Sequence, residues 1–209
     1  MEFREVLRQR RMIRSYDPRP IPRAVLDRVL DAGRRAPSAG FSQGTSFLVL
    51  EGSDLTSTFW KLTAQREPPT PGGRHARLRI APVIILPLSD RSAYFERYSQ
   101  PDKAGRGLDV ESGWPLPYWD IDTAFAVMAM LLAATDEGLG ALFLGIFHGA
   151  AELHDAFGLP EAVTPIGALT LGYPGPGDEP SPSLARGRRP AHDVIHWGRW
   201  RGPPRSGVG

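Results

Sequence analysis

Residues 8–43 read RQRRMIRSYDPRPIPRAVLDRVLDAGRRAPSAGFSQ, and this stretch decides how the rest of the chain is interpreted. It opens with a group of basic side chains: Arg8, Arg10, Arg11 and Arg14. An amphipathic helix is expected from about Pro22, and Ala36 and Pro37 end it before a Pro-Ser-Ala-Gly turn. Guanidinium groups bind phosphate oxygens in pairs, and small residues let main-chain N–H groups approach a ligand closely. The stretch therefore predicts a site for a phosphorylated molecule.

The bulk composition indicates an ordinary globular chain. Its 209 residues suit a single domain, and the hydrophobic share of 41% is enough for a real core. The 25 basic and 23 acidic side chains nearly balance at +2, which argues against a dedicated nucleic-acid binder. Cysteine is absent, so disulfides and thiolate chemistry are excluded, and a cytoplasmic location is expected. We expect no signal peptide and no membrane span, because no apolar run reaches ~18–20 residues.

Hydrophobic periodicity predicts an α+β fold. Helices are expected at residues 2–10, 22–35, 120–137 and 152–160, and strands at 46–50, 82–88, 141–147 and 164–174. The strands alternate irregularly with the helices and lack phosphate loops at their junctions. This pattern favours a central antiparallel or mixed sheet of four to five strands flanked by helices.

Two regions have no clear secondary-structure pattern. Residues 53–79 hold an apolar patch and a proline-glycine loop, and residues 89–118 are aromatic-rich and irregular.

The helix at 120–137 is apolar nearly all round, which predicts burial on every side and most simply a subunit interface. Residues 1–200 are expected to form the domain, and 201–209 a disordered tail.

Three other kinds of site fit the sequence poorly. A metal site lacks a ligand set, because His192 and His196 share a helical spacing without the nearby glutamate of a His-Glu-x-x-His motif. A serine hydrolase would need a G-x-S-x-G elbow, which the sequence does not contain. Nucleic-acid binding would need exposed terminal arginines interleaved with Trp197 and Trp200, and the balanced charge disfavours this alternative.

Four segments in the same order resemble the FMN-dependent nitroreductase family. The opening stretch, continued to residue 50, has the family's paired basic residues, its Ala-Pro-Ser turn and a glutamine before a strand. The other segments are DIDTAFAVMAMLLAATDEGLG at 120–140, GALFLGIF at 140–147, and LTLGYP at 169–174 followed by RGRRPAHDVI at 186–195. The resemblance covers most of residues 3–200, and residues 60–118 match least.

This resemblance implies a nitroreductase-like fold, an intertwined homodimer and bound FMN. The implied reaction is hydride transfer from NADH or NADPH to flavin N5, followed by reduction of a small-molecule acceptor such as a nitroaromatic or a quinone. No side chain is assigned as acid or base, because the cofactor supplies the chemistry. Nucleic acid, membrane and metal are not expected among the partners.

The resemblance also implies a set of cofactor residues. They are Arg10, Arg11, Met12, Arg14, Pro37, Ser38, Ala39, Phe41, Leu144, Gly145, Arg186 and Arg188. Arg10, Arg186 and Arg188 are expected to hold the FMN phosphate, Arg11 to lie along the ribityl chain, and Arg14 to approach the N1/O2 edge of the ring. Pro37, Ser38 and Ala39 would come from the partner subunit, and the backbone N–H of Gly145 would point at N5. The substrate pocket is expected at Phe41, Tyr118 and Trp119.

Two positions depart from the family pattern. Met12 stands where a serine is common and Phe41 where an asparagine is common, and each lost hydrogen bond is expected to cost about 1 kcal/mol of FMN binding. These departures leave open a flavin-binding or sequestering protein without turnover. The aromatic residues at 94–119 leave open an FMN-dependent dehydrogenase or oxidase that acts on a biosynthetic small molecule.

Overall fold

The structure, a computed structural model, describes residues 1–63 and 70–202. Its contacts divide the chain into two units, Met1–Asp178 and Glu179–Gly209, and each is described by itself. The second unit contains two short 3-10 turns, η3 (Pro182–Arg186) and η4 (Ala191–Asp193). The predicted disordered tail lies mostly outside the described residues, and the predicted domain at 1–200 stays a prediction.

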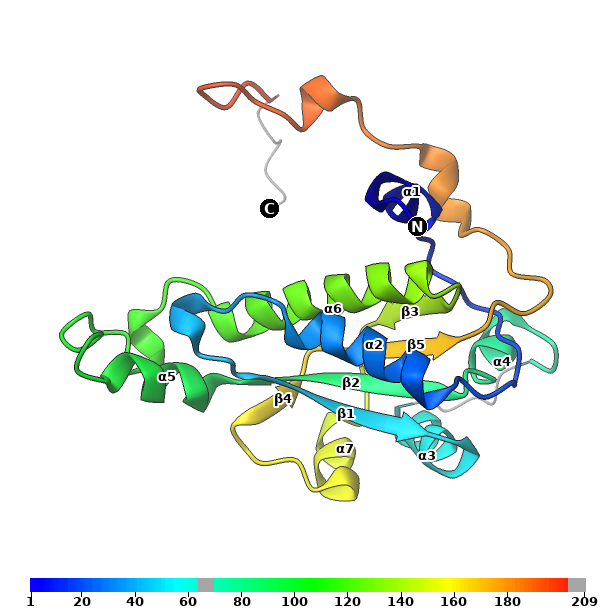
Figure 1. Cartoon of the computed structure of the whole chain (residues 1–209), viewed down its shortest axis with the longest axis horizontal. Coiled ribbons are helices and arrows are strands. Elements are labelled where there is room, and N and C mark those ends of the chain that lie inside the picture. The colour runs from blue at the N-terminus through cyan, green and yellow to red at the C-terminus, as the bar shows by residue number, and fades with distance from the viewer. Residues whose placement is uncertain (64–69, 203–209) are drawn as a thin grey trace. The chain divides into compact units, whose positions relative to one another are not determined.

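The first unit is built on a five-stranded antiparallel sheet (Figure 1). The strands are β1 (Thr45–Glu51), β2 (Val83–Asp90), β3 (Gly140–Leu144), β4 (Val163–Pro165) and β5 (Ala168–Gly172). Their order is β1-β2-β5-β3, with β4 pairing the end of β2. The register places Leu48 opposite Leu86 and Leu142 opposite Thr170. The α+β prediction with a sheet of four to five strands is confirmed.

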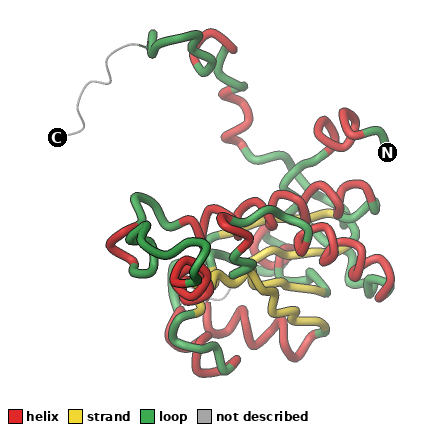
Figure 2. The backbone as a smooth tube through the Cα atoms, turned by 60° about the vertical axis from the view of Figure 1, so that its left-hand side comes forward, coloured by secondary structure: helices red, strands yellow, loops and turns green. Residues whose placement is uncertain are grey.

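Helices cover both faces of this sheet (Figure 2). The helices of the first unit are α1 (Phe3–Gln9), α2 (Arg23–Arg34), α3 (Ser53–Thr63), α4 (Arg74–Leu78), α5 (Arg91–Ser99), α6 (Tyr118–Asp136) and α7 (Ala150–Phe157). Val83 and Ile85 of β2 pack into the cluster under α2 and α6, whereas Ile84 and Leu86 pack into the cluster with α3 and α7. Because successive strand side chains point to opposite faces, β2 contributes to both cores. Among the described residues, none of the helices combines the length and apolarity needed to cross a membrane.

The strand predicted at 164–174 is two strands, and that prediction was wrong. From Leu88 to Ile85, β2 advances three residues while its partner advances four, from Pro165 to Leu169. The extra residue of the partner, between β4 and β5, forms a β-bulge next to Gly167. A side chain at Gly167 would come within 2.5 Å of the Phe143 ring, so glycine is required where the chain bends.

Other boundaries also differ from the sequence predictions. Residues 91–99, expected to be irregular, form α5, whose first turn is capped by Asp90 accepting from the Ser92 N–H. Residues 53–79, left without assignment, contain α3 and α4. Strand β3 ends at Leu144 rather than at 147. Short helices with little amphipathic pattern are stabilised by tertiary packing, and local periodicity gives little sign of them.

Helix α6 is not buried on every side of the single chain. One face packs on α2 and the sheet, and its residues include Ala126, Val127 and Met130. On the opposite face Phe125 is 50% exposed and Met128 is 41% exposed. An apolar face of this kind on a central helix needs a covering surface, which the described residues of this chain do not supply.

Candidate functional site

The arginine-rich segment after α1 is fixed against the outer strand β3. The Ile13 N–H donates to the Ala141 carbonyl at 2.9 Å, and Met12 pairs with Ala141 in a parallel bridge. The buried Tyr16 hydroxyl contacts Thr170 Oγ1 at 2.8 Å, which holds the end of the segment. This pairing leaves Arg10 and Arg14 partly buried beside the sheet.

A partly buried carboxylate, that of Asp178, also holds this segment. The Arg14 N–H donates to Asp178 Oδ1 at 2.8 Å, and Arg11 Nη2 lies 3.9 Å from Asp178 Oδ2. The Ser15 hydroxyl donates to the Pro176 carbonyl at 2.6 Å. The chain therefore returns to the arginine segment just before the second unit begins. The sequence analysis missed Asp178, because it lies in a stretch that looked like a flexible linker.

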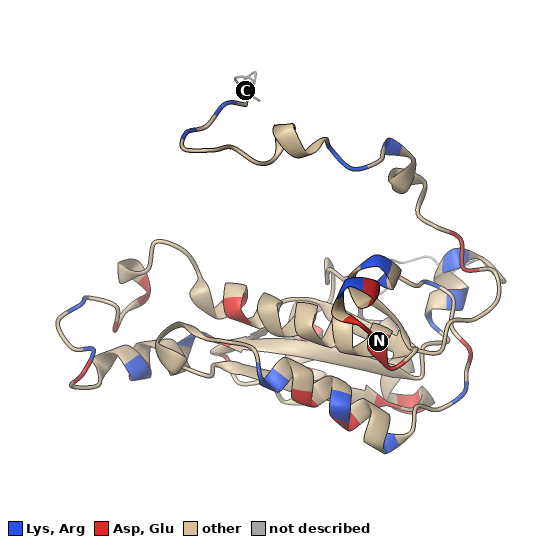
Figure 3. Ribbon diagram, turned by 45° about the horizontal axis from the view of Figure 1, so that its top comes forward, with Lys and Arg blue, Asp and Glu red and all other residues tan. Residues whose placement is uncertain are grey.

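Helix α4 adds two more arginines, which the sequence analysis also missed. Burial lowers the pKa of Arg14, and the positive charge of Arg74 lowers this pKa further, so the two guanidinium groups are close enough to repel each other. Arg77 Nη1 donates to the Gly72 carbonyl at 2.7 Å. Residues 53–79 showed no clear pattern, and the arginines therefore had no predicted place in space. Figure 3 marks basic residues in blue on α1 and α4.

Several buried guanidinium nitrogens in this region have no hydrogen-bond partner among the described residues: Arg10 Nη1, Arg74 Nη2 and Arg77 Nε. Buried donors are normally paired, and an unpaired cation costs more than an unpaired neutral group. An anion would satisfy these donors and relieve the repulsion between Arg14 and Arg74. We call Arg10, Arg14, Arg74 and Arg77 the arginine cluster.

The Pro-Ser-Ala-Gly turn is held by a buried carboxylate, that of Asp122 of α6, which is 4% exposed. Its Oδ2 accepts from the Ala39 N–H and from the Tyr94 hydroxyl, both at 2.7 Å. Arg97 Nε donates to the Gly40 carbonyl at 2.9 Å. Phe41 follows with φ of 55° and is 72% exposed. A bulky residue with positive φ is strained, so the surrounding hydrogen bonds must hold this turn in place.

Replacing Asp122 with alanine should lower the free energy of unfolding by about 2–4 kcal/mol, because Ala39 and Tyr94 would each keep a donor without an acceptor. Urea denaturation followed by circular dichroism measures the loss. Asp122→Asn, which retains an acceptor oxygen, should recover part of it. The exposed Asp109→Ala is the matched control. A loss below about 1 kcal/mol for Asp122→Ala would contradict the assignment.

Within one chain the turn at residues 37–41 and the segment at residues 12–16 lie near opposite ends of α6 (Figure 1). Asp122, which holds the turn, is in the first turns of the helix, whereas the segment containing Arg14 pairs with Ala141, just beyond the helix end at Asp136. A rise of 1.5 Å per residue makes this separation roughly 20 Å. The structure thus does not bring Pro37, Ser38, Ala39 and Phe41 together with the predicted phosphate residues of the same chain.

The remaining predicted residues occupy separate places. Leu144 ends β3 and Gly145 follows it in an exposed position, where a side chain would come 2.9 Å from the Phe147 ring. Tyr118 is partly buried, and Trp119 is 8% exposed within an aromatic cluster that includes Tyr94, Phe95 and Trp114. Arg186 and Arg188 belong to the second unit, so their convergence with Arg10 stays a prediction.

Comparison with solved structures defines the class of protein. NfrA1 of B. megaterium superposes with a TM-score of 0.75 at 20% identity, over 96% of this chain and 76% of that one. A protein of Desulfovibrio desulfuricans, solved in complex with FMN, gives a TM-score of 0.69 at 27% identity, over 96% of this chain and 99% of that one. The architecture is therefore the nitroreductase fold.

The sequence comparisons place the chain within that class. The profile of the Nitroreductase family matches residues 7–173. The oxygen-insensitive NADPH nitroreductase of Salmonella typhimurium is 28% identical over 195 residues, covering 92% of this chain and 72% of that protein. The FMN reductase [NAD(P)H] of Bacillus subtilis is 24% identical over 180 residues, which cover 85% of this chain and 68% of that protein. The chain belongs to the nitroreductase family.

Proposed function

We propose that this protein is an FMN-dependent oxidoreductase that uses NADH or NADPH to reduce a nitroaromatic, a quinone or a related electrophile. The observation that carries the proposal is the set of unpartnered buried donors of Arg10, Arg74 and Arg77. A phosphate monoester offers three acceptor oxygens and up to two negative charges, which fits several guanidinium groups at once. The names of the Bacillus and Salmonella relatives and the FMN complex of the Desulfovibrio protein support the same reading.

Arg10, Arg74 and Arg77 of the arginine cluster would hold the phosphate of FMN. Arg10 and Arg74 offer unpaired donors, and Arg14 is held in place by Asp178 through its backbone N–H. Arg186 and Arg188 of the second unit would add to this site, as the resemblance implies. The side chain of Met12 would offer no hydrogen bond to the phosphate, because it packs into the core beside the sheet. The charge of several arginines would compensate for the serine that the family commonly has at position 12.

The end of β3 would face the flavin ring. Leu144 and Gly145 lie there, and the absence of a side chain at Gly145 allows its main chain to approach a ligand closely. Arg14 would stabilise negative charge at the N1/O2 edge of the ring, as a nearby cation does. When bound, FMN would accept a hydride from the nicotinamide and supply the reducing equivalents for the acceptor. No acid or base is assigned to the protein.

The complete site would need two copies of the chain. The turn at Pro37–Phe41 is rigidly held about one helix length away from the arginine cluster of its own chain, so it would serve the site of a partner subunit. The exposed face of α6 at Phe125 and Met128 would form the contact between the copies. Phe41, Tyr118 and Trp119 would then border the substrate pocket.

An anaerobic titration of the purified protein tests the proposal and its two alternatives. The protein should show the absorption of bound FMN, and NADH or NADPH should bleach it, after which a quinone or a nitroaromatic should restore it. A protein that binds FMN but is bleached by neither nicotinamide would be a flavin carrier or a dehydrogenase of another substrate. A protein that takes up no FMN would overturn the proposal and both alternatives.

A further inference from the structure

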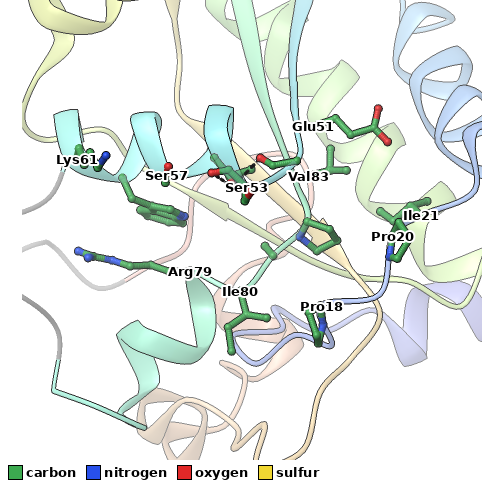
Figure 4. Close-up of a pocket in the computed structure, with 15 residues that line it drawn as sticks. Pro18, Pro20, Ile21, Glu51, Ser53, Ser57, Lys61, Arg79, Ile80 and Val83 are labelled. Carbon is green, nitrogen blue, oxygen red and sulfur yellow. Dashed lines mark hydrogen bonds between the residues drawn. The ribbon is translucent and has the colours of Figure 1, made fainter.

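A cavity of about 760 Å³ lies in the first unit, and no member of the arginine cluster lines it (Figure 4). It is bounded by the connector at residues 18–21, by one side of α3 from Ser53 to Lys61, and by residues 79–83, which lead into and begin β2. None of the predicted cofactor or substrate residues lines this cavity. Its volume is in the range of pockets that hold small organic molecules.

The walls of the cavity are apolar and held rigidly. Ile21 and Val83 are 3% and 0% exposed, because each also packs into the core under α2 and α6. Pro18 and Pro20 fix the backbone of the connector. Trp60 packs edge-to-face on the fully buried Phe59, with 5.0 Å between the ring centroids, which orients the indole. The cavity is therefore formed without a ligand.

Two cations line one side of this cavity, where Figure 4 shows Lys61 and Arg79. In the part of the chain that the structure describes, neither forms a salt bridge within 4.0 Å. The Arg79 guanidinium carbon lies 5.8 Å from the centroid of the Trp60 ring, next to an apolar surface. The acidic residue of the lining, Glu51, lies on the other side in Figure 4.

The negative charge of Glu51 is partly balanced outside the cavity. The pKa of Arg23 is raised mainly by Asp27 and to a smaller extent by Glu51, so the charges of Arg23 and Glu51 attract each other. Lys61 and Arg79 thus leave one end of an apolar cavity positively charged. The hydroxyl of Ser57 donates to the Asp54 carbonyl at 3.1 Å, which leaves its oxygen free to accept a hydrogen bond.

We infer that this cavity is a second ligand site, separate from the flavin site, and that it takes a small organic anion. The flat apolar body of such a molecule packs against Trp60 and the proline walls. Its carboxylate, sulfonate or phosphate pairs with Lys61 and Arg79. A donor group on its body is accepted by Ser57. The inference does not depend on the proposed redox function, since none of these residues belongs to the arginine cluster.

Titration with 8-anilinonaphthalene-1-sulfonate tests the site. This probe has a flat apolar body, one anionic group and one N–H donor, and its fluorescence rises in apolar surroundings. Excess FMN is present throughout, so that the phosphate site is occupied. Each of Lys61→Gln and Arg79→Gln should weaken binding about 5- to 10-fold, and the double variant at least about 25-fold. The exposed Arg106→Gln is the matched control and should bind as the unchanged protein does.

Two comparisons separate charge recognition from simple hydrophobic binding. N-phenyl-1-naphthylamine has the same rings without the sulfonate, so its affinity should change less than about twofold in the charge variants. Ser57→Trp, or Ile80→Trp if the first variant does not fold, should fill the cavity and abolish binding of both probes. The inference would be overturned by a protein that does not bind the sulfonate, by equal losses for the two probes, or by binding that survives the tryptophan.

Discussion

Replacing Arg10 and Arg74 together with glutamine should weaken FMN binding by a factor of roughly 10² to 10⁴. Each guanidinium offers a buried nitrogen without a partner among the described residues, and a charge-assisted hydrogen bond contributes about 1.5–3 kcal/mol. Each single variant should therefore lose about 10- to 100-fold. Isothermal titration calorimetry with FMN measures these constants. Arg74 is the sharper test, because the sequence analysis did not include it.

Riboflavin is the matched ligand for this experiment, because it has the same ring and ribityl chain without the phosphate. Its affinity should fall by less than about threefold in the double variant, since the lost contacts are to the phosphate. Arg4→Gln, on the exposed face of α1, is the control for net charge. The double variant should also retain its unfolding free energy, because it removes unpaired buried cations rather than paired ones. Equal losses of affinity for FMN and riboflavin would contradict a role of Arg10 and Arg74 in binding the phosphate.

The second large effect is expected from charges on the exposed face of α6. The pair Phe125→Glu and Met128→Lys should convert the proposed dimer into monomers, with a dissociation constant raised at least about 1,000-fold. Both side chains are 41–50% exposed in the single chain, so the new charges remain hydrated and the subunit should fold. In a subunit contact the same charges would lose their water. Analytical ultracentrifugation measures the change in mass.

The same variant tests whether the Pro-Ser-Ala-Gly turn serves a partner subunit. Monomers should bind FMN weakly even though their own arginine cluster is intact, because the turn at Ser38 and Ala39 cannot reach it within one chain. Leu55→Glu, at a position of α3 that is 42% exposed, is the matched control and should leave both mass and FMN affinity unchanged. A monomer that binds FMN as tightly as the unchanged protein would show that the turn has no such role.

The long elements were predictable because their local patterns agree with their tertiary surroundings. Helix α2 has buried residues at Leu26, Val29 and Gly33, which is the helical spacing seen in the sequence. Strand β2 is buried at every position from Val83 to Ser89, and a continuous apolar run predicts this. Helix α5 was missed, because only Tyr94 of its nine residues is buried and its pattern is weak. Its stability comes from aromatic contacts with Trp114 and Trp119, which are distant in sequence.

The residues of the candidate site likewise fall into those that the sequence predicted and those that only the structure placed. The sequence by itself determined the fold class, the family resemblance and two members of the arginine cluster, because Arg10 and Arg14 stand close together in the chain. Only the tertiary structure added Arg74, Arg77 and the two carboxylates Asp122 and Asp178, which are tens of residues or more away. Whether a donor is buried and unpaired depends on every segment packed around it, and no local pattern contains that information.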